Sequence, residues 1–163
     1  MLKSTLAVIW RRAPKRLRSW IMRLTHIQFS ATAAGVVFNL DGKVLLLKHV
    51  FRPGSGWGLP GGFIEAGEQA EAALRREVFE EVGLAIESAE LFSVRVFKRP
   101  RQIEIVFLCR ASGDVHPTTL EISEADWFDV SNPPAGLPHD QLKLIQAGSA
   151  GILARQTYEL DSK

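Results

Sequence analysis

Gly61 to Leu84 reads GGFIEAGEQAEAALRREVFEEVGL, and this stretch decides the fold of the 163-residue chain. The composition of residues 68–81 predicts a helix. We expect it to end at Gly83, because glycine is preferred just beyond the C-terminus of a helix. Within that helix Glu77, Glu80 and Glu81 stand at i, i+3 and i+4, so their carboxylates share one face. The stretch therefore predicts a helix with negative charge gathered along one side.

The three glutamates need an opposing charge, because like charges one turn apart destabilise a helix by a few tenths of a kcal/mol per pair. A hard divalent cation suits these oxygen donors best, since Mg²⁺ or Mn²⁺ commonly joins one or two carboxylates to substrate phosphates. The alternative is a solvated acidic face that Arg75 and Arg76 neutralise. The glutamates alone do not decide between a metal site and an ion-paired surface.

Strand patterns lie on both sides of the predicted helix. Short runs rich in apolar and β-branched residues predict strands at 31–38, 43–51, 89–97, 102–111 and 127–130. Residues 40–42, Leu-Asp-Gly, have the composition of a hairpin turn, and residues 139–147 predict a last helix. A helix inserted among strands indicates an α/β domain in which a mixed β-sheet is sandwiched between α-helices.

The composition is that of a single globular domain. A length of 163 residues suits one core, and a content of 46% hydrophobic and 23% charged residues excludes disorder. Cys109 is the only cysteine, which excludes an intramolecular disulfide and an all-cysteine metal site. We expect a cytoplasmic location, with which a single thiol is compatible.

The net charge of +2 is unevenly distributed along the chain. Residues 1–40 contain seven Lys or Arg and no Asp or Glu, whereas the remaining 123 residues contain 13 basic and all 18 acidic groups, a net charge of −5. The pattern indicates a basic arm, residues 1–29, in front of an acidic main domain, residues 30–163.

The arm has helical spacing on both sides of Pro14, with Lys and Arg opposite the apolar positions. Those apolar positions are Leu2, Leu6, Ile9, Trp10, Leu17, Trp20, Ile21 and Leu24. They predict an N-terminal amphipathic helical extension. Three interpretations remain open: packing on the domain or on a homodimer partner, contact with a membrane surface or a polyanion, and an organelle transit peptide.

A fixed spacing links the predicted helix to the loop before it. Gly62, five residues, Glu68, seven residues and then Arg76-Glu-Val-Phe-Glu-Glu-Val-Gly-Leu match G-x5-E-x7-R-E-U-x-E-E-x-G-U at all nine specified positions, U being aliphatic. This is a complete Nudix box, and the chain resembles the Nudix hydrolase superfamily over roughly residues 30–148. The resemblance implies the Nudix fold and hydrolysis of a nucleoside diphosphate linked to another moiety.

The resemblance also implies a divalent-metal site on the helix. Glu77, Glu80 and Glu81 occupy the metal-ligand positions of the family, in which the backbone carbonyl at the position of Gly61 often completes the shell. The expected ion is Mg²⁺, with Mn²⁺ as a substitute. Divalent ions neutralise a diphosphate, polarise its P–O bond and lower the pKa of a bound water.

The remaining box positions are expected to shape that site. Arg76 and Glu68 correspond to the pair that braces the helix and orients the carboxylates, so Arg76 is counted with the catalytic residues. Gly62 and Gly83 hold the positions that fix the loop and the exit from the helix.

A general base has to take the proton of the attacking water. Glu77 is one candidate. Glu121 and Glu124 are the others, because the family often recruits a carboxylate from this later loop. Each loop glutamate has a solvated surface acid as its alternative, and the sequence leaves the choice open.

Substrate contacts are expected from positive side chains near the box. Arg52, in a glycine-rich loop, and Arg95 and Lys98, on the second predicted hairpin, are candidates to reach a phosphate, and each has a solvated surface charge as its alternative. Phe51 is expected in the core. His49 shows no metal-ligand spacing, so no role is assigned to it.

Three classes of function are compatible with these features. The favoured one is a hydrolase with a nucleotide substrate, such as a nucleotide sugar, ADP-ribose, a nucleoside triphosphate or a dinucleoside polyphosphate. The second is a non-catalytic Nudix-fold binding or sensor module, and the third an isoprenoid diphosphate isomerase, which additionally needs Cys and His near the metal. No specific nucleic-acid partner is predicted.

Overall fold

The computed structural model describes residues 10–161, apart from the side chains of residues 22–24 and 153–161. The chain divides into two compact units, one ending at Ser30 and the other beginning at Ala31. In the first unit, residues 10–12 are helical and α2 spans Lys15–Thr25, so the amphipathic helix predicted around residues 17–24 is present. The predicted apolar positions in residues 2–9 lie outside the described residues.

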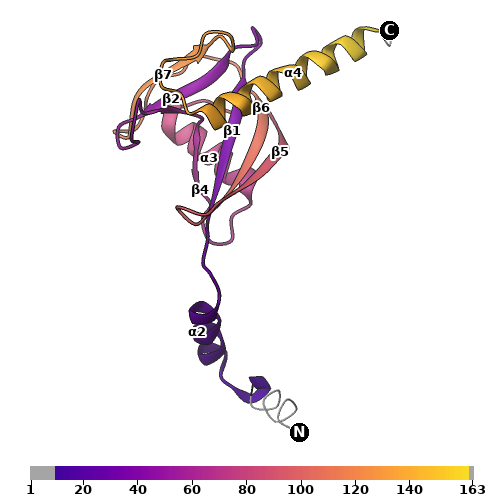
Figure 1. The fold of residues 1–163 in the computed structure, drawn as a ribbon. Helices are drawn as coiled ribbons and strands as arrows, with labels where there is room; N and C mark the ends of the chain where they lie inside the picture. The colour runs from indigo at the N-terminus through magenta and orange to yellow at the C-terminus, as the bar shows by residue number, and fades with distance from the viewer. Residues whose placement is uncertain (1–9, 162–163) are drawn as a thin grey trace. The chain divides into compact units, whose positions relative to one another are not determined.

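The described residues of the second unit form a seven-stranded sheet (Figure 1). Its strands are β1 (Ser30–Phe38), β2 (Val44–His49), β3 (Trp57–Gly58), β4 (Gly61–Phe63), β5 (Ser88–Phe97), β6 (Gln102–Arg110) and β7 (Ile122–Phe128). The main path runs β3-β2-β1-β6-β5, while β4 pairs with β1 and β7 pairs with β2.

The neighbouring strands β1 and β6 make the sheet mixed. Near their first residues, the Gln102 amide donates a hydrogen bond of 2.7 Å to the hydroxyl of Thr32. At their other ends, the N–H of Ala111, the residue after β6, donates a hydrogen bond of 3.1 Å to the carbonyl of Phe38, the last residue of β1. Since the strands meet start to start and end to end, they run parallel, whereas β2, β4 and β7 pair antiparallel with their neighbours. The predicted mixed sheet is confirmed.

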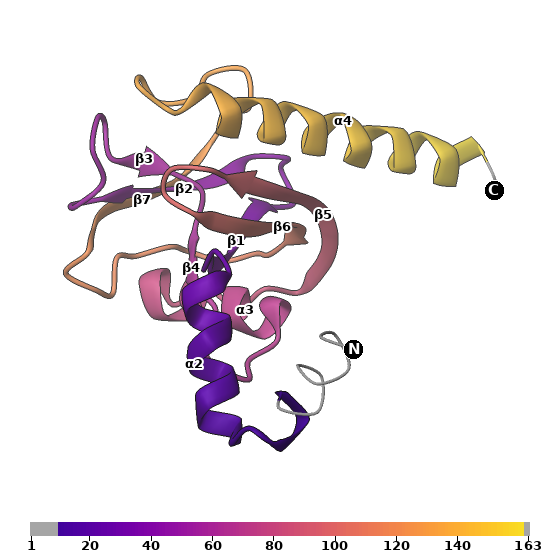
Figure 2. The same cartoon turned by 60° about the horizontal axis from the view of Figure 1, so that its bottom comes forward.

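Two helices cover the two faces of this sheet (Figure 2). On one face, Val37 and Leu47 belong to a buried cluster with Leu74 and Val78 of α3 (Ala70–Val82). On the opposite face, α4 (His139–Asp161) contributes Ile145 to a second cluster. The sandwiched arrangement that the sequence predicts is therefore present.

The second cluster shows why β1 and β2 are apolar along most of their length. Val36, Phe38, Val44 and Leu46 pack with Ile145, and they alternate along the chain with the residues of the first cluster. Successive strand residues point to opposite faces, so a strand covered on both faces needs apolar side chains at consecutive positions.

Several boundaries differ from the sequence prediction. β7 begins at Ile122 rather than Trp127, because it pairs with β2 all the way to His49. β3 and β4 are two and three residues long and lie in a glycine-rich stretch, where no periodicity announces a strand. Phe51, expected in the core, is 80% exposed. Within the described residues, no helix combines the length and the apolar character that a membrane crossing requires.

Candidate active site

Strand β4 and helix α3 bring the two ends of the box together. Gly61 pairs with Ala34 and has a φ of 135°, and a Cβ on it would lie 2.1 Å from the Ala33 carbonyl oxygen. A Cβ on Gly62 would lie 2.4 Å from the carboxylate of Glu77. Glycine at both positions lets the strand backbone approach β1 on one side and the acidic face of α3 on the other.

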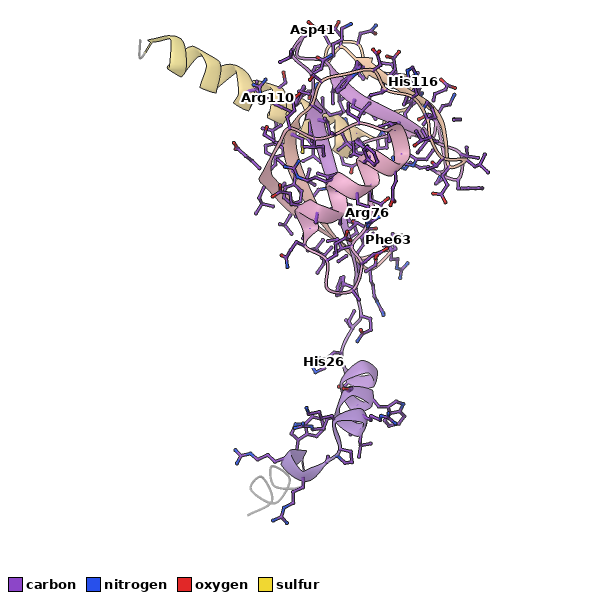
Figure 3. All side chains as sticks on the ribbon, turned by 180° about the vertical axis from the view of Figure 1, so that it is seen from behind. His26, Asp41, Phe63, Arg76, Arg110 and His116 are labelled. Atoms are coloured by element: carbon purple, nitrogen blue, oxygen red, sulfur yellow. The ribbon has the colours of Figure 1, made fainter. Side chains whose placement is uncertain are left out.

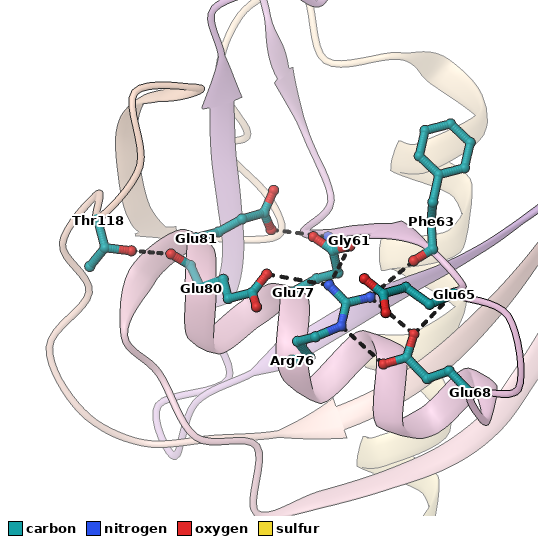
Figure 4. A network of polar contacts seen from close by, with 9 residues as sticks. All are labelled: Gly61, Phe63, Glu65, Glu68, Arg76, Glu77, Glu80, Glu81 and Thr118. Carbon is teal, nitrogen blue, oxygen red and sulfur yellow. Dashed lines mark hydrogen bonds and ion pairs between the residues drawn. The ribbon is translucent and has the colours of Figure 1, made fainter.

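Arg76 is the centre of a polar network on α3 (Figure 4). Its Nε and Nη2 each donate a hydrogen bond of 3.0 Å to Glu68, and Nη2 also donates to the carbonyl of Phe63 at 3.1 Å. Figure 3 shows Arg76 and Phe63 at the same edge of the domain. Nη1 donates to Glu77 at 2.9 Å and to Glu80 at 3.3 Å. One guanidinium thus ties the loop before α3 to two of its three carboxylates.

These contacts shift the pKa values of the two partners in opposite directions. Hydrogen bonding from Arg76 lowers the pKa of Glu68, and hydrogen bonds to Glu68 and then Glu77 raise the pKa of Arg76. Both shifts favour the charged forms. Arg76 and Glu68 therefore stay ionised as a bidentate pair.

Glu81 is the buried carboxylate of the three, with 9% of its surface exposed. It accepts a hydrogen bond of 3.2 Å from the Gly61 N–H. Burial raises the pKa of Glu81 to about 8, and repulsion from Glu77 and Glu121 adds to the shift, while the Gly61 N–H and Arg52 oppose it. Near neutral pH this carboxyl group is therefore largely protonated, and a positive charge beside it would favour its ionised form.

His49 lies beside the site, which the sequence analysis missed. Its Nδ1 is 3.9 Å from a carboxylate oxygen of Glu81. Burial, followed by the charge of Arg52, lowers the pKa of His49 to about 4, so the imidazole is neutral at pH 7 and the approach is not an ion pair. In the pairing of β2 with β7, the register shifts between Lys48 and His49. Only the folded chain reveals this shift, so the sequence gives no local sign that His49 lies beside Glu81.

The donors fit a hard divalent cation, although they are not gathered into a finished site. Among the residues that the structure describes, no three His, Cys, Asp or Glu side chains are grouped so as to hold a metal ion. Glu77 and Glu80 instead face Arg76. All the donors are oxygens, and Glu81 is a buried carboxylate that a cation would stabilise in its charged form.

Of the two arginines expected to neutralise the acidic face, Arg76 contacts the glutamates and Arg75 does not. Arg75 donates to Glu71 at 2.8 Å and also to the Ile86 carbonyl, away from the three glutamates. Of the three glutamates, Arg76 contacts Glu77 and Glu80, so among the described residues no guanidinium is bonded to Glu81.

The two loop glutamates occupy different surroundings. Glu124 on β7 pairs with Lys48 on β2, whose Nζ lies 2.5 Å from its carboxylate. Glu121 precedes β7, and its carbonyl accepts a hydrogen bond of 2.8 Å from the Val50 N–H. The charge of Glu121 is the smallest of the contributions to the raised pKa of Glu81.

Of the three predicted substrate contacts, Arg52 lies next to the box. Its Nη1 is buried and has no hydrogen-bond partner in the part of the chain that the structure describes. A Cβ on Gly58 would lie 1.5 Å from that atom, so the guanidinium rests against the strand backbone. Arg52 lines a cavity of about 200 Å³ beside Gly61 and Gly62. Burial lowers its pKa, and the charges of Glu81 and Glu104 oppose that shift.

Arg95 and Lys98 are placed differently. Arg95 donates to Glu104 at 2.8 Å and to Asp140 at 2.7 Å, which ties β5 to β6 and to the start of α4. Lys98 is exposed in the turn between β5 and β6. The structure therefore engages Arg95 in ion pairs and leaves Lys98 at the surface of a turn, whereas Arg52 faces the cavity.

Together these features define a class: an α/β domain in which one helix carries three neighbouring glutamates, one of which is hydrogen-bonded to Gly61 at a cavity that Arg52 also lines. The NUDIX domain family model matches residues 29–148. The chain belongs to the Nudix family.

Known relatives agree with this assignment. The chain is 37% identical to a MutT-like protein of Streptomyces ambofaciens, over 61% of this chain and 63% of that one. It is 36% identical to an ADP-ribose pyrophosphatase of Methanocaldococcus jannaschii, over 71% of each chain. A crystal structure of a MutT NUDIX hydrolase from Burkholderia pseudomallei matches with a TM-score of 0.65 and 28% identity, over 74% of this chain and 98% of that one.

The extent of these matches limits what they carry over. The chain spans less than two thirds of the MutT-like protein and less than half of several further relatives. Nudix hydrolases generally use divalent metal ions.

The raised pKa of Glu81 predicts a pH-dependent stability. A carboxyl group whose pKa is about 8 in the folded protein and near 4.5 when unfolded stabilises the fold below about pH 4.5, and this contribution is lost as the pH rises through 8. The substitution Glu81→Gln removes the titration. In metal-free buffer we expect it to raise the free energy of unfolding at pH 8.5, relative to its effect at pH 4.5, by about 2 kcal/mol.

Urea unfolding of the wild type and the variant at both pH values measures this difference. Glu71→Gln is the matched control, because Glu71 lies on the same helix and is paired with Arg75. The same pH dependence in the wild type and in Glu81→Gln would contradict the assignment.

Proposed function

We propose that the chain is a Mg²⁺-dependent hydrolase that cleaves the pyrophosphate bond of a nucleoside diphosphate linked to another moiety. One observation carries the proposal: Glu81 is a buried carboxylate that accepts a hydrogen bond from Gly61, and Gly61 lines the same cavity as Arg52. Mg²⁺ is the expected ion because all the donors are oxygens, and Mn²⁺ is its expected substitute.

Glu77, Glu80, Glu81 and the Gly61 carbonyl would hold the cation. When bound, it supplies charge neutralisation of the diphosphate and a lower pKa for the attacking water. Arg76 holds Glu77 and Glu80 on the side of α3 that faces β4, through its hydrogen bonds of 2.9 and 3.3 Å. Positioning of this kind dominates phosphoryl transfer, because the protein does little covalent chemistry in such reactions.

We assign the general base to Glu121. A base needs a carboxylate that is free to accept a proton, and Glu124 is neutralised by Lys48 while Glu77 is bonded to Arg76. The effect of Glu121 on the pKa of Glu81 supports its place at the site. Glu77 is the second candidate.

Arg52 is proposed to bind a phosphate of the substrate. Its Nη1 is buried, has no hydrogen-bond partner among the described residues and belongs to a side chain lining the cavity. A buried donor without a partner is costly, so an anionic oxygen at this point would stabilise the complex. Gln102 and Gln141 line the same cavity and add amide groups suited to a sugar or a base.

ADP-ribose is the substrate to test first. The match to the relative named ADP-ribose pyrophosphatase covers 71% of each chain, which supports a nucleoside diphosphate sugar as the substrate. Other nucleotide sugars and nucleoside triphosphates belong to the same proposal. A non-catalytic module is less well supported, because this chain retains every glutamate of the box. The cytoplasmic location stays a prediction.

A product-resolved screen tests the metal-dependent reaction. Purified protein is incubated with ADP-ribose, nucleotide sugars and nucleoside triphosphates with Mg²⁺ or with chelator, and the fragments identify the phosphorus attacked. We expect Mg²⁺-dependent cleavage, reduced about 100-fold or more by Glu80→Gln and by Glu81→Gln. Glu71→Gln, on the same helix but paired with Arg75, should retain activity. Full activity in chelator, or in Glu81→Gln, would refute the metal assignment.

Arg52 can be tested separately from the metal ligands. Loss of a charged hydrogen bond to a phosphate should raise KM of Arg52→Gln by about 10-fold to 100-fold while kcat changes little. Lys98→Gln is the matched control, since Lys98 is exposed in the β5–β6 turn. A rise in KM for Lys98→Gln together with an unchanged KM for Arg52→Gln would show that Lys98, and not Arg52, makes the phosphate contact.

A further inference from the structure

Helix α2 carries an apolar face that the proposed hydrolysis does not use. Leu17, Trp20 and Ile21 stand at i, i+3 and i+4, the spacing that places side chains on one side of a helix. Trp20 is 59% exposed and Leu17 is 46% exposed. Large apolar side chains gathered on a helix and exposed to water indicate a surface that meets another apolar phase.

The segment that contains α2 also carries exposed positive charge. Arg11, Arg12, Lys15 and Arg16 are exposed, and no Asp or Glu occurs before residue 41. Surface helices that only face water usually mix both signs of charge, because opposite charges three or four residues apart stabilise a helix. A helix with one sign alone is suited to a partner of the opposite sign.

The apolar face and the positive charge together indicate what kind of partner this segment binds. Tryptophan is favoured at the level of lipid headgroups, and Lys or Arg on the polar face attracts anionic lipids. The chain from residue 41 onward has a net charge of −5, so an anionic bilayer attracts the basic segment and repels the rest of the chain. A membrane surface therefore satisfies both faces of α2 at once.

We propose that residues 10–25 dock the protein on a membrane surface rich in anionic phospholipid. Leu17 and Trp20 enter the boundary between headgroups and acyl chains, and the basic side chains lie among the headgroups. This inference is independent of the proposed hydrolysis, because it rests on residues outside the Nudix match at residues 29–148.

Co-sedimentation of the full chain with vesicles tests the proposal. Vesicles of phosphatidylcholine with about 30% phosphatidylserine should bind at least about tenfold more protein than phosphatidylcholine alone, and about 0.5 M salt should reverse most of the binding. The charge variant Arg11→Gln/Lys15→Gln/Arg16→Gln should reduce binding about tenfold or more.

The apolar face is tested by a second variant, Leu17→Ser/Trp20→Ser, which should also reduce binding about tenfold while leaving the charge unchanged. Its matched control is Leu40→Ser/Leu120→Ser, because both leucines are exposed outside α2, at 80% and 96%. The control should bind as the wild type does. Thermal unfolding of each variant checks that the domain is folded.

The charge variant has its own control, Lys43→Gln/Arg99→Gln/Lys143→Gln, which removes three exposed positive charges from the second unit. Equal binding to neutral and anionic vesicles, or equal losses in the arm variants and their controls, would overturn the proposal. So would binding to heparin or RNA without binding to vesicles. A dimer that Leu17→Ser/Trp20→Ser dissociates, with no vesicle binding, would assign the apolar face to a second copy of the chain.

Discussion

The candidate site depends on the hydrogen bonds that the guanidinium of Arg76 donates. This group reaches Glu68 and the Phe63 carbonyl in the loop before α3, and Glu77 and Glu80 on the helix itself. Without it, two carboxylates would repel each other across one turn and the loop would lose its bidentate tie to the helix. Among the described residues no guanidinium is bonded to the buried Glu81, and a cation beside it would favour its ionised form, which supports the proposed divalent-metal site.

The sheet supplies the rigid support for that contact. β1 is buried on both faces, so its pairing with β4 fixes the backbone at Gly61 and Gly62 against a close-packed core. Leu74 and Val78 anchor the opposite side of α3 in that core. The acidic face of the helix is thereby held against β4, and the cavity lined by Arg52 lies at the same strand.

The sequence predicts the parts of this arrangement that depend on local spacing. The box predicts α3 and its three glutamates, and short apolar runs predict the long strands. The helix ends as expected at Gly83, which has a positive φ. What it does not predict depends on pairing between distant segments. The short strands β3 and β4, the placement of His49 beside Glu81 and the ion pairs of Arg95 all follow from tertiary contacts with no local signature. Cys109 is buried in the core, where burial raises its pKa to about 12, so the thiol that an isomerase would need is packed instead.

Binding of Mn²⁺, followed by its electron paramagnetic resonance signal, tests most directly whether Arg76 orients a divalent-metal site on α3. If Arg76 holds the carboxylates in place, Arg76→Gln should weaken Mn²⁺ binding by about 10-fold to 100-fold in a protein that remains folded. Unchanged or tighter binding would contradict the account, because it would show that Arg76 only neutralises the acidic face.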